Sequence, residues 1–497
     1  MRLRMLAVVA VLSFSAAAAT GDTSMTTTGV LRSALVADAV ATIDSLCSAP
    51  RYRHAMIGIA VVDARTSEVI YERNSEISLL PASCLKAITT AFALRQLGPE
   101  HRFETRLEAI GEVADGVLTG SLVIRGGGDP TLGSDKVDGS LSSGTLLSQW
   151  VEAVQRAGIR EISGGVQGDP SYLPDDPLPS GWMWEDIGNY YAAGTSGLAF
   201  YDNLYHLYFR PGARVGDPAK IVRTEPPIPQ IRWTNRMLTG PADSGDQGYI
   251  YGQPGSWERT TRGTVPLGPE FSIKGSVPSP HVVAADALRN ALETSGIRVR
   301  SPRRHGRTLP VTSGESRLLA VTVSPPLSKI VHRLNKESNN FYAEMLLLHA
   351  GKSAGAQDRK SAIEAEMKYL ESLGVPTGGL RINDGSGLSR LNFVTAAGMA
   401  RFMQAVQREP WFDIWLASLP HMGVDADLKE RHADTPLKGR VRAKTGLIER
   451  VRGLTGYLDA KSGARICFAI ILNGYDDSWV AVDGDVDVML RALHDAL

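Results

Sequence analysis

Ser83-Cys84-Leu85-Lys86 opens a stretch whose apolar residues recur with helical spacing until Gly98-Pro99, a strong signal for a helix C-terminus. Ser83 and Lys86 are three residues apart, so on the first turn of a helix both side chains face the same side. A lysine kept uncharged by burial or by a nearby cation can accept a serine proton. The alternative is an ordinary helix start, with Ser83 as N-cap and Lys86 in solvent. We favour a catalytic pair because the proline-led turn Leu80-Pro81-Ala82 precedes it.

Ser338-Asn339-Asn340 supplies a second set of polar groups ahead of an apolar helical pattern. The Ser338 hydroxyl could relay a proton to a leaving amine, while the Asn340 amide holds a substrate carbonyl. The alternative is a helix N-cap, a common role for serine and asparagine. Tyr201-Asp202-Asn203 is a rival triad with tyrosine in place of serine. We interpret it as structural because it lies in an alternating, strand-like run.

Lys444-Thr445-Gly446 begins an edge-strand pattern that continues through Leu447-Ile448. The lysine and the hydroxyl can bind the terminal carboxylate of a substrate, and the glycine would let the substrate backbone approach closely. The alternative is a surface lysine in a turn. That interpretation suits the rival Lys461-Ser462-Gly463, which lies between two strands. Each motif is weak alone, but the three in this order favour serine acyl transfer without a histidine.

The composition is that of an ordinary globular protein with more than one domain. The 497 residues exceed what one core usually supports, and the 43% hydrophobic and 21% charged contents are typical. Basic and acidic residues balance at 53 each, which excludes the electrostatic footprint of a nucleic-acid-binding protein. No polybasic patch is present either, so we expect at most a weak association with a membrane surface.

Cysteine usage and metal-ligand spacing point to a protein that relies on its apolar core. Cys47, Cys84 and Cys467 are too few for a disulfide-stapled scaffold. One disulfide remains open, and the sequence selects no pair. The His and Cys residues show no metal-ligand spacing, so we predict neither a metal site nor a cofactor.

The N-terminus has the organisation of a signal peptide. Arg2 and Arg4 form a positive region, residues 5–14 are apolar but too few to span a bilayer, and residues 16–19 offer an A-x-A cleavage site. We therefore predict that residues 1–20 are a signal peptide and that the protein is secreted or periplasmic, without a transmembrane segment.

The remaining chain alternates between helical and β-rich regions. Residues 57–62 and 68–71 form a predicted hairpin, and a second hairpin is predicted near the C-terminus, so one antiparallel sheet could combine both chain ends. Between them, residues 101–309 are rich in glycine and proline, which indicates a mainly β insertion of two small domains. Helices are predicted at 30–46, 146–157, 284–292, 327–370, 395–406, 412–417 and 479–497, and strands at 121–124, 204–208, 310–312, 453–458 and 466–472.

With these motifs the chain resembles the penicillin-binding D-alanyl-D-alanine carboxypeptidases/endopeptidases of low-molecular-mass class C. The resemblance extends to Gly126-Gly127-Gly128-Asp129-Pro130-Thr131-Leu132 and to Asp384-Gly385-Ser386-Gly387-Leu388-Ser389-Arg390. It covers nearly all of the chain after residue 20. The long separation between the first and second motifs is similar to that of this class, whose extra domains are inserted there.

The resemblance implies an α/β (α+β) fold. Residues 30–100 and 310–497 would form a penicillin-binding/β-lactamase-like transpeptidase domain, the DD-peptidase domain, in which helices flank an antiparallel sheet. Residues 101–309 would be the inserted, mainly β region.

The resemblance also implies the site residues. Ser83 would be the acylated nucleophile, Lys86 its base and Ser338 the proton relay. Two positions depart from the family pattern: Asn339 replaces a frequent aspartate, and Leu447 replaces a frequent small hydroxyl residue, which could alter side-chain selectivity. Substrate would be bound by Asn340, Lys444, Thr445, Gly446 and Leu447, with the backbone N–H groups of Ser83 and Leu447 as the oxyanion hole.

The expected function is that of a serine D-Ala-D-Ala carboxypeptidase/DD-endopeptidase that acts on peptidoglycan stem peptides. The reaction would pass through an acyl-enzyme on Ser83, which β-lactam antibiotics would also acylate. Two alternatives remain: a serine β-lactamase, and a catalytically silent peptidoglycan-binding scaffold that retains the fold.

Overall fold

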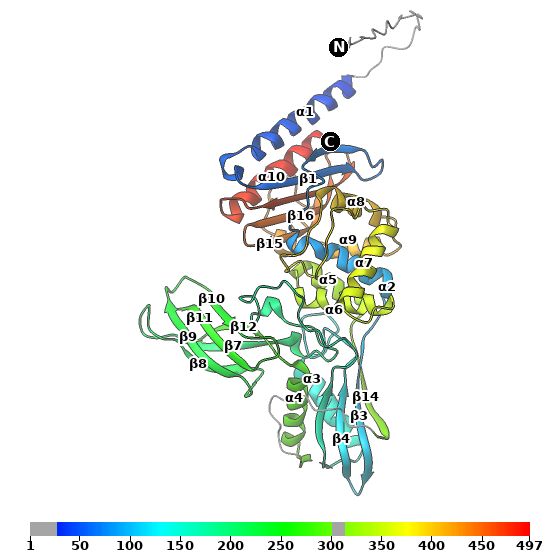
Figure 1. Ribbon diagram of the computed structural model, residues 1–497, viewed down its shortest axis with the longest axis vertical. Helices are drawn as coiled ribbons and strands as arrows, with labels where there is room; N and C mark the ends of the chain where they lie inside the picture. The colour runs from blue at the N-terminus through cyan, green and yellow to red at the C-terminus, as the bar shows by residue number, and fades with distance from the viewer. Residues whose placement is uncertain (1–26, 301–313) are drawn as a thin grey trace, which may run out of the picture.

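The computed structural model describes residues 27–300 and 314–497 (Figure 1). The predicted signal peptide and the predicted strand at residues 310–312 lie outside the described residues.

A five-stranded antiparallel sheet combines strands from both ends of the chain, as the sequence predicts. The first strand pairs with the last from Met56 opposite Asn473 to Asp63 opposite Ile466. The strand order is β15-β16-β17-β1-β2, which leaves β15, the strand with the third motif, at one edge. The strands are β1 (Met56–Asp63), β2 (Val69–Arg73), β15 (Val441–Ile448), β16 (Val451–Asp459) and β17 (Arg465–Asn473).

Both faces of this sheet are covered by helices. Side chains alternate along a strand, so Ile57, Ile59 and Val61 point to one face while Ala60 and Val62 point to the other. The first set belongs to a core shared with the two terminal helices, and the second set to a core shared with the motif-bearing helices. The terminal helices are α1 (Thr27–Cys47) and α10 (Trp479–Ala496); the others are α2 (Lys86–Leu97), α5 (Leu327–Glu337), α6 (Asn340–Ser353), α7 (Arg359–Ser372), α8 (Ala396–Val406) and α9 (Phe412–Ser418).

Helices α2 and α6 form the interior of the second core. Most residues of both helices are buried, on every side of each helix, which is the pattern of a helix surrounded by protein. Because both motif-bearing turns lie at the N-terminal ends of these buried helices, the fold holds them rigidly.

The inserted region begins with a six-stranded sheet and two helices. Its edge strand β14 pairs with β3, so this sheet extends to Val323, past the boundary that the sequence suggests at residue 309. The chain thus makes one more pass along the inserted sheet before it returns to the helices. The strands are β3 (Glu104–Ala114), β4 (Val117–Arg125), β5 (Glu161–Ile162), β6 (Gly165–Asp169), β13 (Arg298–Val299) and β14 (Ser316–Val323); the helices are α3 (Ser143–Arg156) and α4 (Pro280–Thr294).

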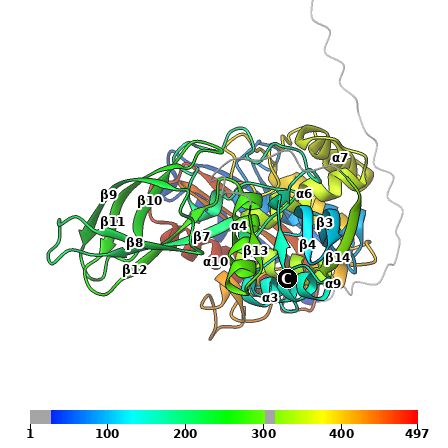
Figure 2. The ribbon, with the colours of Figure 1, turned by 90° about the horizontal axis from the view of Figure 1, so that it is seen from below.

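A second inserted module projects sideways from the molecule, and we call it the β-lobe (Figure 2). It consists of two three-stranded sheets, β10-β11-β9 and β12-β7-β8. One continuous apolar core includes residues of both inserted modules, for example Leu107 and Phe209. The strands are β7 (Leu204–Arg210), β8 (Lys220–Glu225), β9 (Arg232–Gly240), β10 (Gln247–Tyr251), β11 (Glu258–Pro266) and β12 (Phe271–Ser276).

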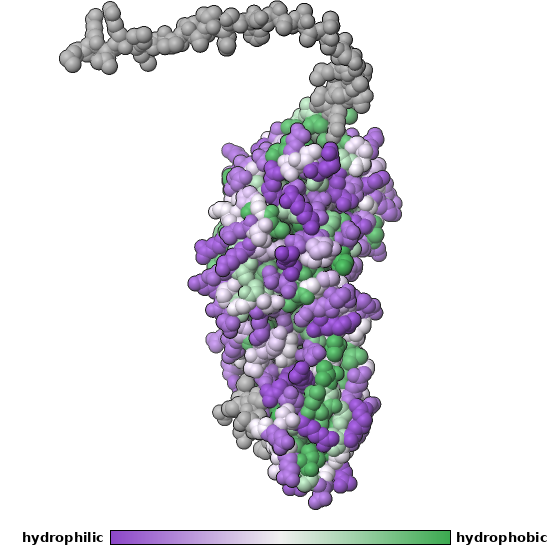
Figure 3. Space-filling view, turned by 90° about the vertical axis from the view of Figure 1, so that its right-hand side faces the viewer, coloured by the Kyte–Doolittle hydropathy of each residue, from purple (hydrophilic) through white to green (hydrophobic). Residues whose placement is uncertain are grey.

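The surface is mixed in character. Figure 3 shows mainly hydrophilic residues, with an apolar strip low on this face. Among the exposed apolar side chains are Leu318, Val321 and Val323 of β14. Within residues 27–300 and 314–497, we find no helix with the length and apolarity that a membrane crossing requires. All three cysteines are free and buried.

Candidate active site

Ser83 and Lys86 meet at the N-terminal end of α2. Residues Ala82–Leu85 form a 3-10 turn that continues into α2 at Lys86. The Lys86 Nζ lies 2.7 Å from the Ser83 Oγ, and the lysine side chain is fully buried. Burial and the nearby Lys444 lower the pKa of Lys86 well below its usual value, whereas Asp384 and Glu344 oppose this shift. A buried, uncharged amine at this distance can accept the serine proton.

The loop of residues 384–389 fixes the other side of Lys86. Its Ser386 carbonyl accepts a hydrogen bond of 2.6 Å from the Lys86 Nζ. Gly387 has φ +81°, and a Cβ there would lie 1.9 Å from the Ala82 carbonyl oxygen, so only glycine lets the loop approach the serine turn. The residues alone predict a loop without a functional role here, and only the family resemblance indicates that this segment matters.

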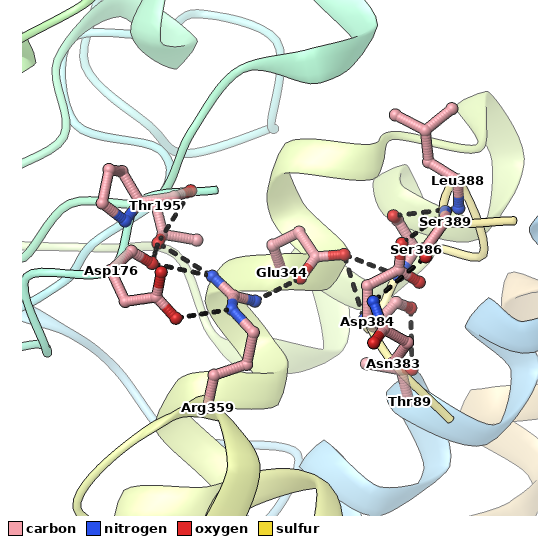
Figure 4. A network of polar contacts seen from close by, with 12 residues as sticks. Thr89, Asp176, Thr195, Glu344, Arg359, Asn383, Asp384, Ser386, Leu388 and Ser389 are labelled. Carbon is pink, nitrogen blue, oxygen red and sulfur yellow. Dashed lines mark hydrogen bonds and ion pairs between the residues drawn. The ribbon is translucent and has the colours of Figure 1, made fainter. Parts of the chain in front are cut away.

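A buried ion pair between Glu344 and Arg359 supports this loop (Figure 4). The Glu344 Oε1 accepts hydrogen bonds from the backbone N–H groups of Gly385 and Ser386 at 3.0 and 2.8 Å. The Glu344 Oε2 lies 2.5 Å from the Arg359 Nη1. Burial and Asp384 raise the pKa of Glu344 to about 7, although Arg359 opposes them. Glu344 on α6 thus connects α7 to the loop that contacts Lys86.

The inserted region also contributes to this network. The Arg359 Nη2 donates to the Asp176 carbonyl at 3.0 Å, and the Trp182 Nε1 donates to the Asp384 Oδ2 at 2.8 Å. The same Oδ2 accepts a 2.7 Å hydrogen bond from the Ser389 backbone N–H. The insertion therefore braces the 384–389 loop directly at Asp384 and indirectly through Arg359 and Glu344.

Ser338 and Asn340 lie at the break between α5 and α6. Ser338 has left-handed backbone angles, φ 55° and ψ 39°, which turn the chain sharply between the two helices. Asn339 caps α6 by accepting a 3.0 Å hydrogen bond from the Tyr342 N–H, the role that the sequence offered as the alternative for this motif. The Asn340 Nδ2 donates to the Tyr191 carbonyl at 2.8 Å. The helix cap and the predicted site are compatible, because Asn339 forms the cap and Ser338 and Asn340 do not.

Lys444 and Thr445 lie on the edge strand β15. Lys444 is fully buried, and its Nζ donates to the Thr445 carbonyl at 3.0 Å. Burial lowers the pKa of Lys444, and Asp427 opposes this shift. The Thr445 hydroxyl donates a short hydrogen bond to the Asp427 carboxylate. The Thr445 hydroxyl, for which the sequence predicts a substrate carboxylate as partner, therefore binds the carboxylate of Asp427, a residue that no sequence pattern indicates.

Gly446 brings β15 against the serine turn. A Cβ on Gly446 would lie 2.5 Å from the Pro81 carbonyl oxygen and 3.1 Å from the Cys84 Sγ. The Cys84 Sγ in turn lies 3.4 Å from the Lys444 carbonyl oxygen. The close approach that this glycine permits is thus between two segments of the protein, whereas the sequence had suggested an approach of substrate.

One cavity of about 1530 Å³ joins the three motifs. Asp186 and Arg390 also line it. Arg390 ends the segment 384–390 that the family resemblance includes, without a role assigned to it, and no motif indicates Asp186. Three of the predicted site residues do not line the cavity but lie next to residues that do: Lys86, Lys444 and Gly446. The predicted site residues that line the cavity are Ser83, Ser338, Asn340, Thr445 and Leu447.

The rival triad Tyr201-Asp202-Asn203 has a structural role, but not in a strand. All three residues have positive φ and form a 3-10 turn directly before β7. Asp202 accepts hydrogen bonds from Lys136 and from the Tyr342 hydroxyl, the latter at 2.8 Å. The alternating pattern thus predicted the wrong local structure, because left-handed backbone angles cannot be read from polarity.

Comparisons with known proteins agree with this geometry. The D-Ala-D-Ala carboxypeptidase 3 (S13) family matches residues 39–490. A D-alanyl-D-alanine carboxypeptidase of an Actinomadura species is 32% identical over 453 residues, which cover 87% of this chain and 80% of that protein. The D-alanyl-D-alanine carboxypeptidase DacB of Haemophilus influenzae is 25% identical over 438 residues, which cover 84% of this chain and 85% of that protein.

Solved structures show the same fold. The crystal structure of penicillin binding protein 4 (dacB) from Haemophilus influenzae matches with a TM-score of 0.76 and 22% identity, covering 91% of this chain and 98% of that chain. A second crystal structure of that protein, complexed with a β-lactam, matches with a TM-score of 0.70 and 21% identity over the same shares. The resemblance seen in the sequence is confirmed: this chain belongs to the D-Ala-D-Ala carboxypeptidase 3 (S13) family.

Proposed function

We propose that this serine-type carboxypeptidase removes the terminal D-Ala of peptidoglycan stem peptides and also cleaves their D-Ala cross-links. The observation that carries the proposal is the 2.7 Å contact between Lys86 and Ser83 at a cavity that Ser338, Asn340 and Thr445 also line. A nucleophile, a base, a relay hydroxyl and an amide are then within reach of one bound peptide.

The reaction would proceed in two steps. Lys86 accepts the Ser83 proton, and the Ser83 Oγ bonds to the carbonyl carbon of the penultimate D-Ala. The amide C–N bond breaks, and the leaving amine receives a proton through the Ser338 hydroxyl. Water then hydrolyses the ester on Ser83 and releases the shortened stem.

Substrate binding would use the edge strand. The terminal carboxylate of the stem would replace Asp427 at the Thr445 hydroxyl, and the buried Lys444 behind it would supply positive charge. Asn340 would hold a peptide carbonyl. The backbone N–H groups of Ser83 and of Leu447, which follows Gly446, would stabilise the oxyanion.

A β-lactam presents a strained amide that the same serine can open, and the complex of the Haemophilus influenzae protein with a β-lactam supports this extension. Peptidoglycan lies outside the cytoplasmic membrane, so we further propose that residues 1–20 direct export to the periplasm.

Two measurements on the purified protein test the function. D-Ala release from muropeptides, together with a long-lived penicillin adduct, is the expected result. Rapid turnover of penicillin would instead identify a β-lactamase, and neither D-Ala release nor an adduct would identify a silent scaffold. The Ser83→Ala variant should lose both signals.

A further inference from the structure

Four large aromatic side chains gather where the inserted region faces the Ser83 cavity. Trp184 is 58% exposed, Tyr190 50% and Tyr249 47%, and the partly exposed Tyr251 lies among them. Tryptophan and tyrosine are usually buried for most of their area, so a cluster of exposed rings marks a binding surface. We call Trp184, Tyr190, Tyr249 and Tyr251 the aromatic platform.

Three of the four rings, those of Trp184, Tyr249 and Tyr251, lie against one another. Trp184 and Tyr251 are stacked, with ring centroids 4.9 Å apart and an interplanar angle of 29°. Tyr249 and Tyr251 are two residues apart on β10, so they point to the same face, with ring planes 34° apart. Because β10 is paired along its length with β11, this surface is formed before any ligand binds.

The platform connects the Ser83 cavity to a second hollow of about 510 Å³ on the β-lobe. Tyr251 lines both, Tyr190 and Tyr249 line the first, and Trp184 and Trp233 line the second. In Figure 1, β10 lies on the side of the β-lobe towards β15. A ligand whose reacting end is at Ser83 and whose body is longer than a peptide stem would extend along these rings.

Basic side chains lie over two of the rings. The Arg262 guanidinium lies 5.6 Å from the Tyr251 ring centroid, and the Lys274 Nζ lies 5.8 Å from that of Tyr190. Arg232 lines the second hollow. Apolar ring faces with N–H donors close by suit a ligand that has an apolar face and a polar perimeter.

A pyranose ring has that character, since its C–H face is apolar and its hydroxyl and acetamido oxygens accept hydrogen bonds around the edge. We infer that the aromatic platform binds the glycan strand that carries the stem peptide processed at Ser83. This inference rests on the proposed function, because the stem would anchor the strand beside the platform. Single-stranded nucleic acid also stacks on aromatic rings, but the balanced charge of the chain disfavours it.

Binding of soluble, peptide-free glycan strands to the full-length protein, measured by calorimetry, tests the inference. We expect saturable binding to the wild type and an affinity about tenfold lower in Trp184→Ala and in Tyr251→Ala, the size of one lost stacking contact. Trp184→Phe keeps a flat ring and should restore most of the affinity. Tyr172→Ala is the matched control, because Tyr172 is exposed but lines neither cavity.

Activity provides the second measurement. Trp184→Ala should release D-Ala from a sugar-free stem peptide at the wild-type rate but from intact sacculi several-fold more slowly. An active wild type that binds no glycan would overturn the inference and leave the function intact, whereas a wild type inactive on the stem peptide would overturn the function. Unchanged glycan affinity in both alanine variants, or tighter binding of a single-stranded oligonucleotide than of glycan, would also overturn the inference.

Discussion

The Nζ of Lys86 lies 2.7 Å from the Oγ of Ser83, although the lysine is completely buried. A charged ammonium would be costly in that position, and an uncharged amine is what the chemistry needs. Replacing Lys86 with glutamine should therefore slow acylation by a fluorescent penicillin about 10²–10⁴-fold, the usual contribution of a general base. Lys360→Gln, at an exposed lysine, should acylate at the wild-type rate. Normal acylation in a folded Lys86→Gln protein would exclude this lysine as the base.

The lowered pKa of Lys86 predicts how kcat/KM depends on pH. Burial and Lys444 lower its pKa well below 10.5, and Asp384 and Glu344 counteract this shift. Below the lowered pKa the amine is protonated and cannot accept a proton, so kcat/KM should fall on the acid side. Glu344→Gln removes a negative charge above about pH 7 and lowers the Lys86 pKa further. The acid limb, measured with a soluble peptide substrate, should then move to lower pH; a move to higher pH would contradict the assignment.

The contact between β15 and the serine turn depends on Gly446. In Gly446→Ala, the added methyl group would meet the Pro81 carbonyl oxygen at 2.5 Å and push the strand away from Ser83. Overpacking of this kind costs about 1–3 kcal/mol, and the acylation rate should fall as well. Gly144→Ala is the matched control, because nothing lies within 4 Å of the added Cβ. Urea unfolding and penicillin labelling measure both effects, and wild-type behaviour of Gly446→Ala would refute the close contact.

The ion pair between Arg359 and Glu344 should stabilise the loop behind Lys86. Arg359→Met leaves the fully buried Glu344 without its cation, which typically costs about 3–5 kcal/mol in the free energy of unfolding. Its neighbour on α7, Lys360, pairs with Glu364 at the surface, so Lys360→Met should unfold like the wild type. Equal urea midpoints for the two variants would show that the buried pair has no such role.

Local patterns in the sequence predicted much of the fold and the core of the site. The strands of the central sheet follow from runs of β-branched residues, and the pairing of Ser83 with Lys86 follows from a three-residue spacing on a helical turn. Both features depend on residues that are close together in the chain, so they can be predicted from the sequence alone.

The partners that complete the site could not be predicted in this way. The Ser386 carbonyl that binds Lys86 is 300 positions away and belongs to the backbone, which leaves no side-chain signal. Asp427 reaches Thr445 because a left-handed residue, Ala426 with φ 55°, turns the loop before it. Strand β14, which follows the boundary that the composition suggests at residue 309, pairs with a strand some 200 positions earlier in the chain, and pairing over that distance leaves no local signal.

Mass spectrometry of the penicillin-treated protein tests most directly whether the three motifs form one acylating site. We expect a single stable adduct on the peptide that contains Ser83, with none in Ser83→Ala and a slower one in Lys86→Gln. An adduct on another residue, or its persistence in Ser83→Ala, would contradict the account.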